Sequence, residues 1–185
     1  MNNNIKNVAC VGAGLIGQGW ATLFAAAGYA VTLQDVSDAK LKGAIDQVSL
    51  NLRLLADNGR LYHGTAAGAA KNIRTTLSLL EAVKGVDFVL ESVPDNYATK
   101  KTVFKEMDAL APGDTILASS SSGLLMSEIQ TVVLRPERCV LVHPFLPVHL
   151  LPLVEVVGGD QTAPETVDIT CSCLLYTSDA ADERV

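Results

Sequence analysis

The sequence is poor in charged and aromatic residues, which make up 18% and 5% of its 185 positions. Hydrophobic residues make up 49%, enough for the core of one α/β domain but not of two full domains. No run approaches the ~20 consecutive apolar residues of a membrane span. The start, MNNNIKN, lacks the charged and apolar regions of a secretion signal. These absences predict a cytoplasmic protein without a membrane partner.

Excess positive charge is also missing, because the formal net charge is −6 and the pI is near 5. Such a surface repels nucleic acid and anionic membranes, so we expect neither as a partner. It does not exclude an anionic cofactor, since a helix N-terminus can hold phosphate without Lys or Arg.

Only four cysteines are present, and their surroundings predict no metal site. Cys10 and Cys139 lie in apolar runs, which indicates buried, reduced thiols. Cys171 and Cys173 form a C-x-C pair, but no His or second cysteine pair nearby completes a zinc site.

Apolar runs typical of strands alternate with segments typical of helices. The expected strands are residues 5–11, 30–35, 72–76, 86–92, 115–119, 138–143 and 153–157. The expected helices follow GAGLIG up to Gly28 and cover residues 38–57, 77–85, 97–110 and 124–130, whereas residues 58–71 favour neither element. Continuous apolar strands alternating with helices predict a Rossmann-type α/β fold, a doubly wound, mostly parallel sheet covered on both faces.

The first predicted strand runs into GAGLIG, which matches G-x-G-x-x-G and opens a helix. In this motif Gly12 permits the tight turn, Gly14 lets a pyrophosphate touch the backbone, and Gly17 lets helix and strand pack closely. The first helical residues, Leu15 and Ile16, offer free N–H groups at a positive dipole end. The segment therefore predicts a dinucleotide site.

An acidic residue, Asp35, ends the second predicted strand, at the distance of about 20 residues that the motif requires. A carboxylate there accepts hydrogen bonds from the adenosine ribose and repels a 2′-phosphate. Val36 and Ser37 follow it rather than Arg, so we predict NAD and not NADP. The alternatives are FAD, which uses the same motif, and a glycine-rich turn beside a surface Asp.

Three polar features lie near strand ends in the second half: the serine run 119–122, His143 and Glu155. Glu155 interrupts the apolar run LLPLVEVV, so we expect a buried carboxylate that needs a partner. His143 is the expected partner, because imidazole exchanges a proton near neutral pH and a carboxylate stabilises its protonated form. Structural roles remain open for all three, as does a Ser-His-Glu hydrolase, although no G-x-S-x-G motif is present.

Five segments in order resemble the 3-hydroxyacyl-CoA dehydrogenase family: GAGLIG, ESVPDN, ASSSSGLL, RPERCVLVHPF and LPLVEVVGGDQTAPETVD. The resemblance implies an NAD-binding Rossmann domain that serves the oxidation of a 3-hydroxy substrate by hydride transfer from C3. It also implies that His143 is the catalytic base, Glu155 its partner, and Ser122 the hydroxyl that hydrogen-bonds the reacting oxygen.

By the same resemblance, Asp95 and Lys100 contact the cofactor near its nicotinamide end, where Lys100 could equally be a solvated helix charge. In the family Asp95 is usually Glu. The segment His143 to Pro147 reads HPFLP, so Leu146 stands where the family has an Asn that helps to hold the substrate. Loss of such a contact costs about 1–3 kcal/mol, so the alternatives are a different substrate, reduced activity, or a sequencing error at Leu146.

The serine-only run and the segment HPF-x-P-x-x-LLPLVEVVGG resemble the branch of carnitine dehydrogenase and L-gulonate 3-dehydrogenase (lambda-crystallin). No dense Lys/Arg cluster between residues 38 and 75 could meet a CoA 3′-phosphate. The expected substrate is therefore a small 3-hydroxy acid, with 3-hydroxyacyl-CoA as the alternative. The resemblance implies a homodimer for the full-length protein.

The end of the chain, CLLYTSDAADE at residues 173–183, resembles a translated sequencing adapter. We expect residues 1–172 to form the NAD-binding domain and residues 173–185 to be a non-native tail. The family's helical C-terminal domain would then be missing. A cofactor-binding fragment without catalysis is the resulting alternative to an enzyme.

Titration with NAD and NADP tests the cofactor assignment, because only NADP carries the phosphate that Asp35 repels. NAD should bind at least tenfold more tightly in calorimetry. Binding of neither nucleotide would remove the dehydrogenase interpretation.

Overall fold

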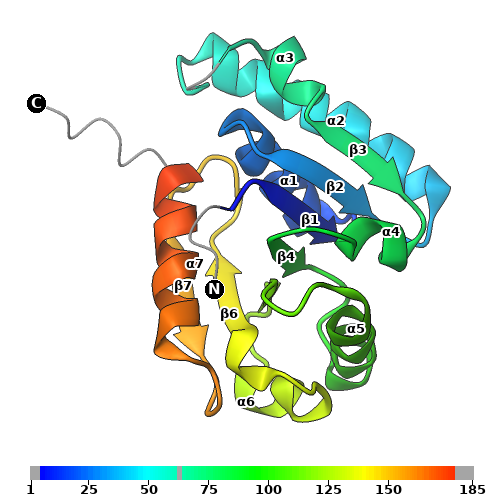
Figure 1. Cartoon of the computed structure of the whole chain (residues 1–185). Coiled ribbons are helices and arrows are strands. Elements are labelled where there is room, and N and C mark those ends of the chain that lie inside the picture. Colours follow the sequence, from blue (N-terminus) through cyan, green and yellow to red (C-terminus); the bar gives the residue numbers. More distant parts are fainter. Residues whose placement is uncertain (1–4, 62–63, 178–185) are drawn as a thin grey trace, which may run out of the picture.

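The computed structural model describes residues 5–61 and 64–177, in which seven strands form one twisted sheet in the order β3-β2-β1-β4-β5-β6-β7 (Figure 1). The strands are β1 (Asn7–Val11), β2 (Ala30–Gln34), β3 (Ile73–Thr76), β4 (Phe88–Glu91), β5 (Ile116–Ser119), β6 (Cys139–Pro144) and β7 (Val154–Gly158). The first six strands run parallel, and β7 pairs antiparallel with β6. The predicted doubly wound, mostly parallel sheet is confirmed, and its order is that of Rossmann domains.

Seven α-helices are described, six of them between strands and α7 after the last strand. They are α1 (Leu15–Ala26), α2 (Asp38–Asp57), α3 (Ala66–Ala70), α4 (Leu79–Val83), α5 (Tyr97–Leu110), α6 (Met126–Ile129) and α7 (Pro164–Thr177), with short 3₁₀ helices at Gln130–Val132 and Pro136–Arg138. The short α3 lies in the stretch for which the sequence favoured neither element. In the described part of the chain, no helix has both the length and the apolar composition that a membrane crossing requires.

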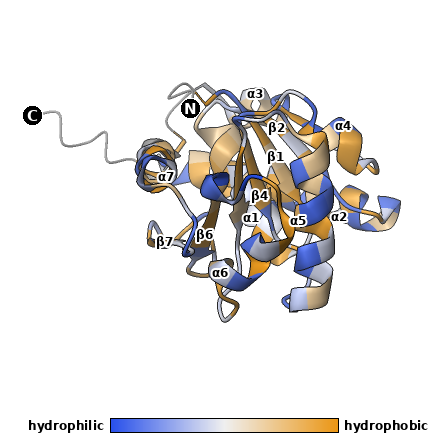
Figure 2. Ribbon diagram, turned by 60° about the horizontal axis from the view of Figure 1, so that its bottom comes forward, coloured by the Kyte–Doolittle hydropathy of each residue, from blue (hydrophilic) through white to orange (hydrophobic). Residues whose placement is uncertain are grey.

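Helices cover both faces of the sheet, and each face has its own core (Figures 1 and 2). Residues alternate between the faces along each strand, so Val8 and Cys10 of β1 meet α1, α2 and α7, whereas Ala9 and Val11 meet α4, α5 and α6. Strands buried on both faces explain why their sequences are continuously apolar.

The buried thiols fit this packing. Cys10 and Cys139 are fully buried, and burial raises the pKa of each thiol to about 12, because the low-dielectric core disfavours the thiolate. The predicted burial of both is confirmed. Among the described residues, no group of three or more His, Cys, Asp or Glu side chains could hold a metal ion.

Local signals set the helix boundaries. Gly28, with φ of +88°, follows the C-cap of α1 in a conformation that favours glycine. Ser37 and Asn96 cap α2 and α5, since their side-chain oxygens accept hydrogen bonds from the amides of Lys40 and Thr99.

The last described helix, α7, packs beside β6 and β7 and crosses the expected domain boundary at residue 172 (Figure 1). Cys173 and Leu174 are buried in the core on that face. The boundary itself remains a prediction, because packing does not reveal the origin of a sequence.

One buried ion pair lies at the end of the sheet where the parallel strands begin. Arg138 Nη2 lies 2.6 Å from Asp108 Oδ1, and both side chains are at most 4% exposed. Burial raises the pKa of Asp108, but the hydrogen bonds from Arg138 and the Leu134 amide, with the Arg138 charge, outweigh it and hold the pKa below its ordinary value.

Asp108→Asn should lower the free energy of unfolding by about 3–5 kcal/mol, because it leaves a buried guanidinium unpaired. Since the folded-state pKa is lowered, the wild-type contribution is fully present above about pH 4 and is lost as the pH falls through that folded-state value. Urea unfolding at pH 7 and pH 3 measures both effects. Lys42→Gln, which removes only an exposed ion pair with Asp38, should leave the unfolding curve unchanged.

Candidate cofactor and catalytic site

The glycine turn between β1 and α1 is shaped by close backbone contacts. Gly12 has φ of +100°, and a Cβ there would lie 2.7 Å from the carbonyl oxygen of Ser92. A Cβ on Gly17 would overlap the Gly12 carbonyl, so only glycine lets α1 pack this closely on the turn. A Cβ on Gly14 would instead point into open space. The backbone at Gly14 is therefore accessible from outside, as a phosphate requires.

The N-terminus of α1 faces the same space. Its N-cap, Gly14, makes no side-chain hydrogen bond, and Leu15 at the first helical position is 67% exposed. Within residues 5–61 and 64–177, no side chain accepts a hydrogen bond from the first-turn amides, including that of Ile16, and the positive end of the helix dipole lies there. The first turn can hold phosphate without a cation.

Asp35 lies just beyond β2 and is tied to the glycine turn. One carboxylate oxygen accepts a hydrogen bond from the Ala13 amide and the other from the Ser37 amide, both at 3.0 Å. A carboxylate offers about four acceptor positions, so others remain for ribose hydroxyls. The exposed Val36 beside it brings no cation for a 2′-phosphate. The turn, the helix end and Asp35 together fit a dinucleotide of the NAD type.

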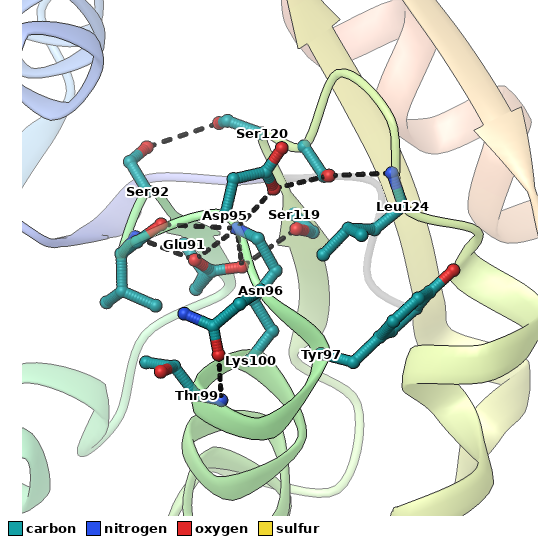
Figure 3. Close-up of polar contacts among 12 residues, drawn as sticks. Glu91, Ser92, Asp95, Asn96, Tyr97, Thr99, Lys100, Ser119, Ser120 and Leu124 are labelled. Carbon is teal, nitrogen blue, oxygen red and sulfur yellow. Dashed lines mark hydrogen bonds and ion pairs between the residues drawn. The ribbon is translucent and has the colours of Figure 1, made fainter.

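The serine run follows β5 at the same sheet edge. Three of its hydroxyls are hydrogen-bonded inside the protein, in the pairs Ser119–Glu91, Ser120–Trp20 and Ser121–Asp95 (Figure 3 shows Glu91 and Asp95). Ser122 is exposed, and across residues 5–61 and 64–177 its hydroxyl has no protein partner. It is the member of the run that remains free to bind a ligand.

Lys100 of α5 is not the solvated charge that the sequence allowed, because its side chain is only 1% exposed. Its ammonium lies 2.7 Å from Glu91 Oε1 and 3.6 Å from Asp95 Oδ1 (Figure 3). Asp95 is 47% exposed, so it can meet a ligand from outside. The cofactor contact of Lys100 remains a prediction, and its burial leaves Asp95 as the more accessible of the two.

Sheet register brings His143 and Glu155 together. They are directly opposite in the β6–β7 pair, and His143 Nδ1 lies 2.8 Å from Glu155 Oε2. The expectation of a buried carboxylate was wrong, since the Glu155 side chain is 59% exposed and that of His143 is 24% exposed. The reason is that β7 is an edge strand, so apolar neighbours in the sequence do not imply cover on both faces.

The hydrolase alternative loses support from the same geometry. In the described residues no hydrogen bond joins Ser122 to His143, whereas an activated nucleophile is expected within reach of its base.

Comparison with known proteins assigns this arrangement to a family. Residues 7–177 match the family described as "3-hydroxyacyl-CoA dehydrogenase, NAD binding domain". The chain belongs to the 3-hydroxyacyl-CoA dehydrogenase family. The predicted family and the NAD cofactor are thereby confirmed.

Relatives of two kinds agree with this assignment. An L-carnitine dehydrogenase of Bacillus cereus is 40% identical over 91% of this chain and 50% of its own length, and lambda-crystallin of Oryctolagus cuniculus is 36% identical over 89% and 52%. Both lie in the predicted branch of the family. The chain spans about half the length of these curated relatives.

The fold also matches a solved member of the 3-hydroxyacyl-CoA dehydrogenase family. The structure of 3-hydroxybutyryl-CoA dehydrogenase from Escherichia coli K12 superposes with a TM-score of 0.89 at 30% identity, covering 94% of this chain and 37% of that one. The Rossmann domain is therefore shared between acyl-CoA and carnitine enzymes, and the fold alone does not select the substrate.

Two polar residues beneath the site escaped the sequence interpretation. Glu91 is fully buried at the end of β4, and Trp20 of α1 donates its indole hydrogen to Ser120 at 3.1 Å. The available signals were a carboxylate that ends an apolar strand and a lysine, Lys100, on the helix that follows.

Glycine substitutions separate binding from packing at the turn. Gly14→Ala should weaken NAD binding at least tenfold with little change in melting temperature, because the added methyl group points into ligand space. Gly17→Ala should lower the melting temperature by several degrees, because its methyl group meets the Gly12 carbonyl. Calorimetry and thermal unfolding measure both. Equal NAD affinity of Gly14→Ala and wild type would place the phosphates elsewhere.

Proposed function

We propose that the protein oxidises a small 3-hydroxy acid with NAD, with His143 as the base that removes the hydroxyl proton. The observation that supports this proposal most directly is the 2.8 Å contact between His143 and Glu155 at the sheet edge that carries the glycine turn. When bound, NAD supplies a hydride acceptor, and Gly12, Gly14, Gly17 and Asp35 are the residues that would hold it.

His143 can act through one ring nitrogen only. Its Nδ1 is committed to Glu155, so the tautomer with hydrogen on Nδ1 leaves the Nε2 lone pair free to take a proton from a substrate hydroxyl. Glu155 then stabilises the imidazolium that forms. This pair supplies general-base catalysis, for which correct positioning matters as much as basicity.

Ser122 is the proposed hydrogen-bond donor to the reacting oxygen. Its exposed hydroxyl has no protein partner in the described part of the chain, so binding substrate breaks no internal bond. The neighbouring Ser121 is held by Asp95 at 2.6 Å and braces the backbone on which Ser122 lies. Asp95 and Lys100 are proposed to serve the nicotinamide end of the cofactor.

The charge distribution favours a substrate without CoA. Six Lys and Arg residues are spread along residues 38–75, with no dense run among them. Three of the six have partners in the protein, since Lys42 pairs with Asp38, Arg60 donates to the Leu150 carbonyl, and Arg74 donates to Thr32. The curated relatives also include L-carnitine dehydrogenases. We therefore propose L-carnitine or L-gulonate as the substrate class, with 3-hydroxyacyl-CoA as the alternative.

Leu146 belongs to this substrate question. Its side chain is 49% exposed beyond β6, where the family resemblance expects an Asn. An apolar side chain cannot hydrogen-bond a substrate there, which supports a substrate that differs from those of the acyl-CoA enzymes. Homodimerisation is proposed on the family resemblance, and a cytoplasmic location on the features of the sequence.

Turnover assays test the proposal directly. The chain is incubated with NAD and L-carnitine, L-gulonate or 3-hydroxybutyryl-CoA, and NADH formation is followed by absorbance. His143→Asn should reduce kcat at least a hundredfold, because general-base catalysis contributes about that much or more. His149→Asn, which changes the other described histidine, should leave kcat unchanged.

The outcomes separate the alternatives. NAD binding without turnover of any of the three compounds would favour a cofactor-binding fragment over an enzyme. Turnover that survives in His143→Asn would exclude His143 as the base.

A further inference from the structure

Glu91 accepts more hydrogen bonds than any other carboxylate of the described site, although it is not among the residues that would touch NAD or substrate. Its side chain is fully buried at the carboxyl end of β4. Oε1 accepts hydrogen bonds from the Val93 amide and the Lys100 ammonium, both at 2.7 Å. Oε2 accepts from Ser119 Oγ at 2.7 Å and from Lys100 Nζ at 3.0 Å (Figure 3).

These donors come from three separate segments. Val93 lies in the loop after β4, Lys100 lies in α5, and Ser119 ends β5. Burial holds the pKa of Glu91 above its ordinary value, although the Lys100 charge and the hydrogen bonds from Lys100, Ser119 and Val93 oppose that rise. Because every contact is a donor to the carboxylate, the arrangement is matched to the anionic form.

Hydrogen bonds also join the loops 92–96 and 119–122 directly to each other. Ser121 donates to Asp95 at 2.6 Å, and Ser92 Oγ lies 3.2 Å from Ser120 Oγ (Figure 3). Ser120 also accepts from Trp20 of α1, the helix that begins at the glycine turn. The loops 92–96 and 119–122 therefore form one hydrogen-bonded surface with Glu91 beneath it.

Strand order locates this surface relative to NAD. The phosphates belong at the β1–α1 turn, and Asp35 beyond β2 marks the adenosine side. The rest of the dinucleotide must extend in the opposite direction, over the ends of β4 and β5 and toward His143 on β6. The nicotinamide half of NAD is therefore expected over the loops 92–96 and 119–122, which are both hydrogen-bonded to Glu91.

We propose that Glu91 is a positioning residue for the nicotinamide half of NAD, acting through the loops 92–96 and 119–122. It touches no ligand itself, because it is fully buried. Its carboxylate fixes the spacing between the two loops and directs Lys100 toward Asp95. This inference rests on NAD binding and not on the proposed oxidation of a hydroxy acid.

Glu91→Gln tests the proposal, because the amide keeps the shape of the side chain but replaces one acceptor oxygen with an NH₂ group. That NH₂ group cannot accept the hydrogen bonds that the surrounding donors now make to the carboxylate. Affinities for NAD and ADP are measured by calorimetry with the full chain. ADP carries the adenosine half and both phosphates but no nicotinamide half. The NAD affinity should fall about tenfold, while the ADP affinity stays within twofold of wild type.

Asp108→Asn is the matched control, because it breaks a similarly buried ion pair at the opposite end of the strands. It should lower the melting temperature and leave the ratio of NAD to ADP affinity unchanged. Ser119→Ala covers the case in which Glu91→Gln does not fold, because it removes one hydrogen-bond donor to Glu91 and leaves the ion pair between Glu91 and Lys100 in place. It should lower the ratio of NAD to ADP affinity in the same direction as Glu91→Gln but by less, with a smaller loss of melting temperature.

Two results would overturn the proposal. One is a folded variant that loses NAD and ADP affinity equally, which indicates a general structural role. The other is an unchanged ratio in Glu91→Gln, or in Ser119→Ala where Glu91→Gln does not fold. Neither result depends on turnover, so a failure of the proposed oxidation would appear separately, as NAD binding without NADH formation.

Discussion

The candidate site exists because parallel strands end together. The strands β1, β2, β4, β5 and β6 share one direction, so the residues that follow them gather at one edge of the sheet. Each loop contributes a different chemical group there: backbone amides after β1, a carboxylate after β2, hydroxyls after β5 and an imidazole at the end of β6. The imidazole of His143 and the carboxylate of Glu155 belong to the strands β6 and β7 themselves, and the two buried cores below fix this end of the sheet in place.

Burial of polar groups beneath the carboxyl ends of the strands costs free energy, which their hydrogen bonds and ion pairs offset. Glu91, Lys100 and Ser119 are almost fully buried, and each is hydrogen-bonded. A buried ion pair of this kind is weak evidence for stability, since desolvation cancels much of the attraction. Its value lies in geometry, because a fully satisfied buried network holds its loops in one arrangement. Preorganised loops are what a hydride-transfer site requires.

The antiparallel strand β7 brings Glu155 to His143. In an antiparallel ladder, directly opposite residues have side chains on the same face, which is why His143 meets Glu155. The pair lies at the sheet edge with the Glu155 side chain 59% exposed, so water screens their interaction. Glu91 and Glu155 therefore differ in setting: Glu91 is a buried carboxylate hydrogen-bonded to three segments, and Glu155 is an exposed carboxylate paired with a histidine.

Much of this protein follows from its sequence alone, where the determinants are local. Alternating apolar runs and helical segments predicted the Rossmann sheet, because strand and helix patterns depend on near neighbours. GAGLIG and Asp35 predicted the dinucleotide site, since the motif's glycines act through a turn only a few residues long. Local pattern also suggested His143 and Glu155 as a pair, but gave the wrong burial for Glu155.

Only the tertiary structure decided which partner each polar side chain has. Lys100 and Glu91 are nine positions apart in a strand and a helix, and nothing in either segment states that they are buried together. The link from Trp20 to Ser120 joins residues a hundred positions apart. Such contacts depend on how the layers pack, and strand order and register set them over distances that no local pattern records.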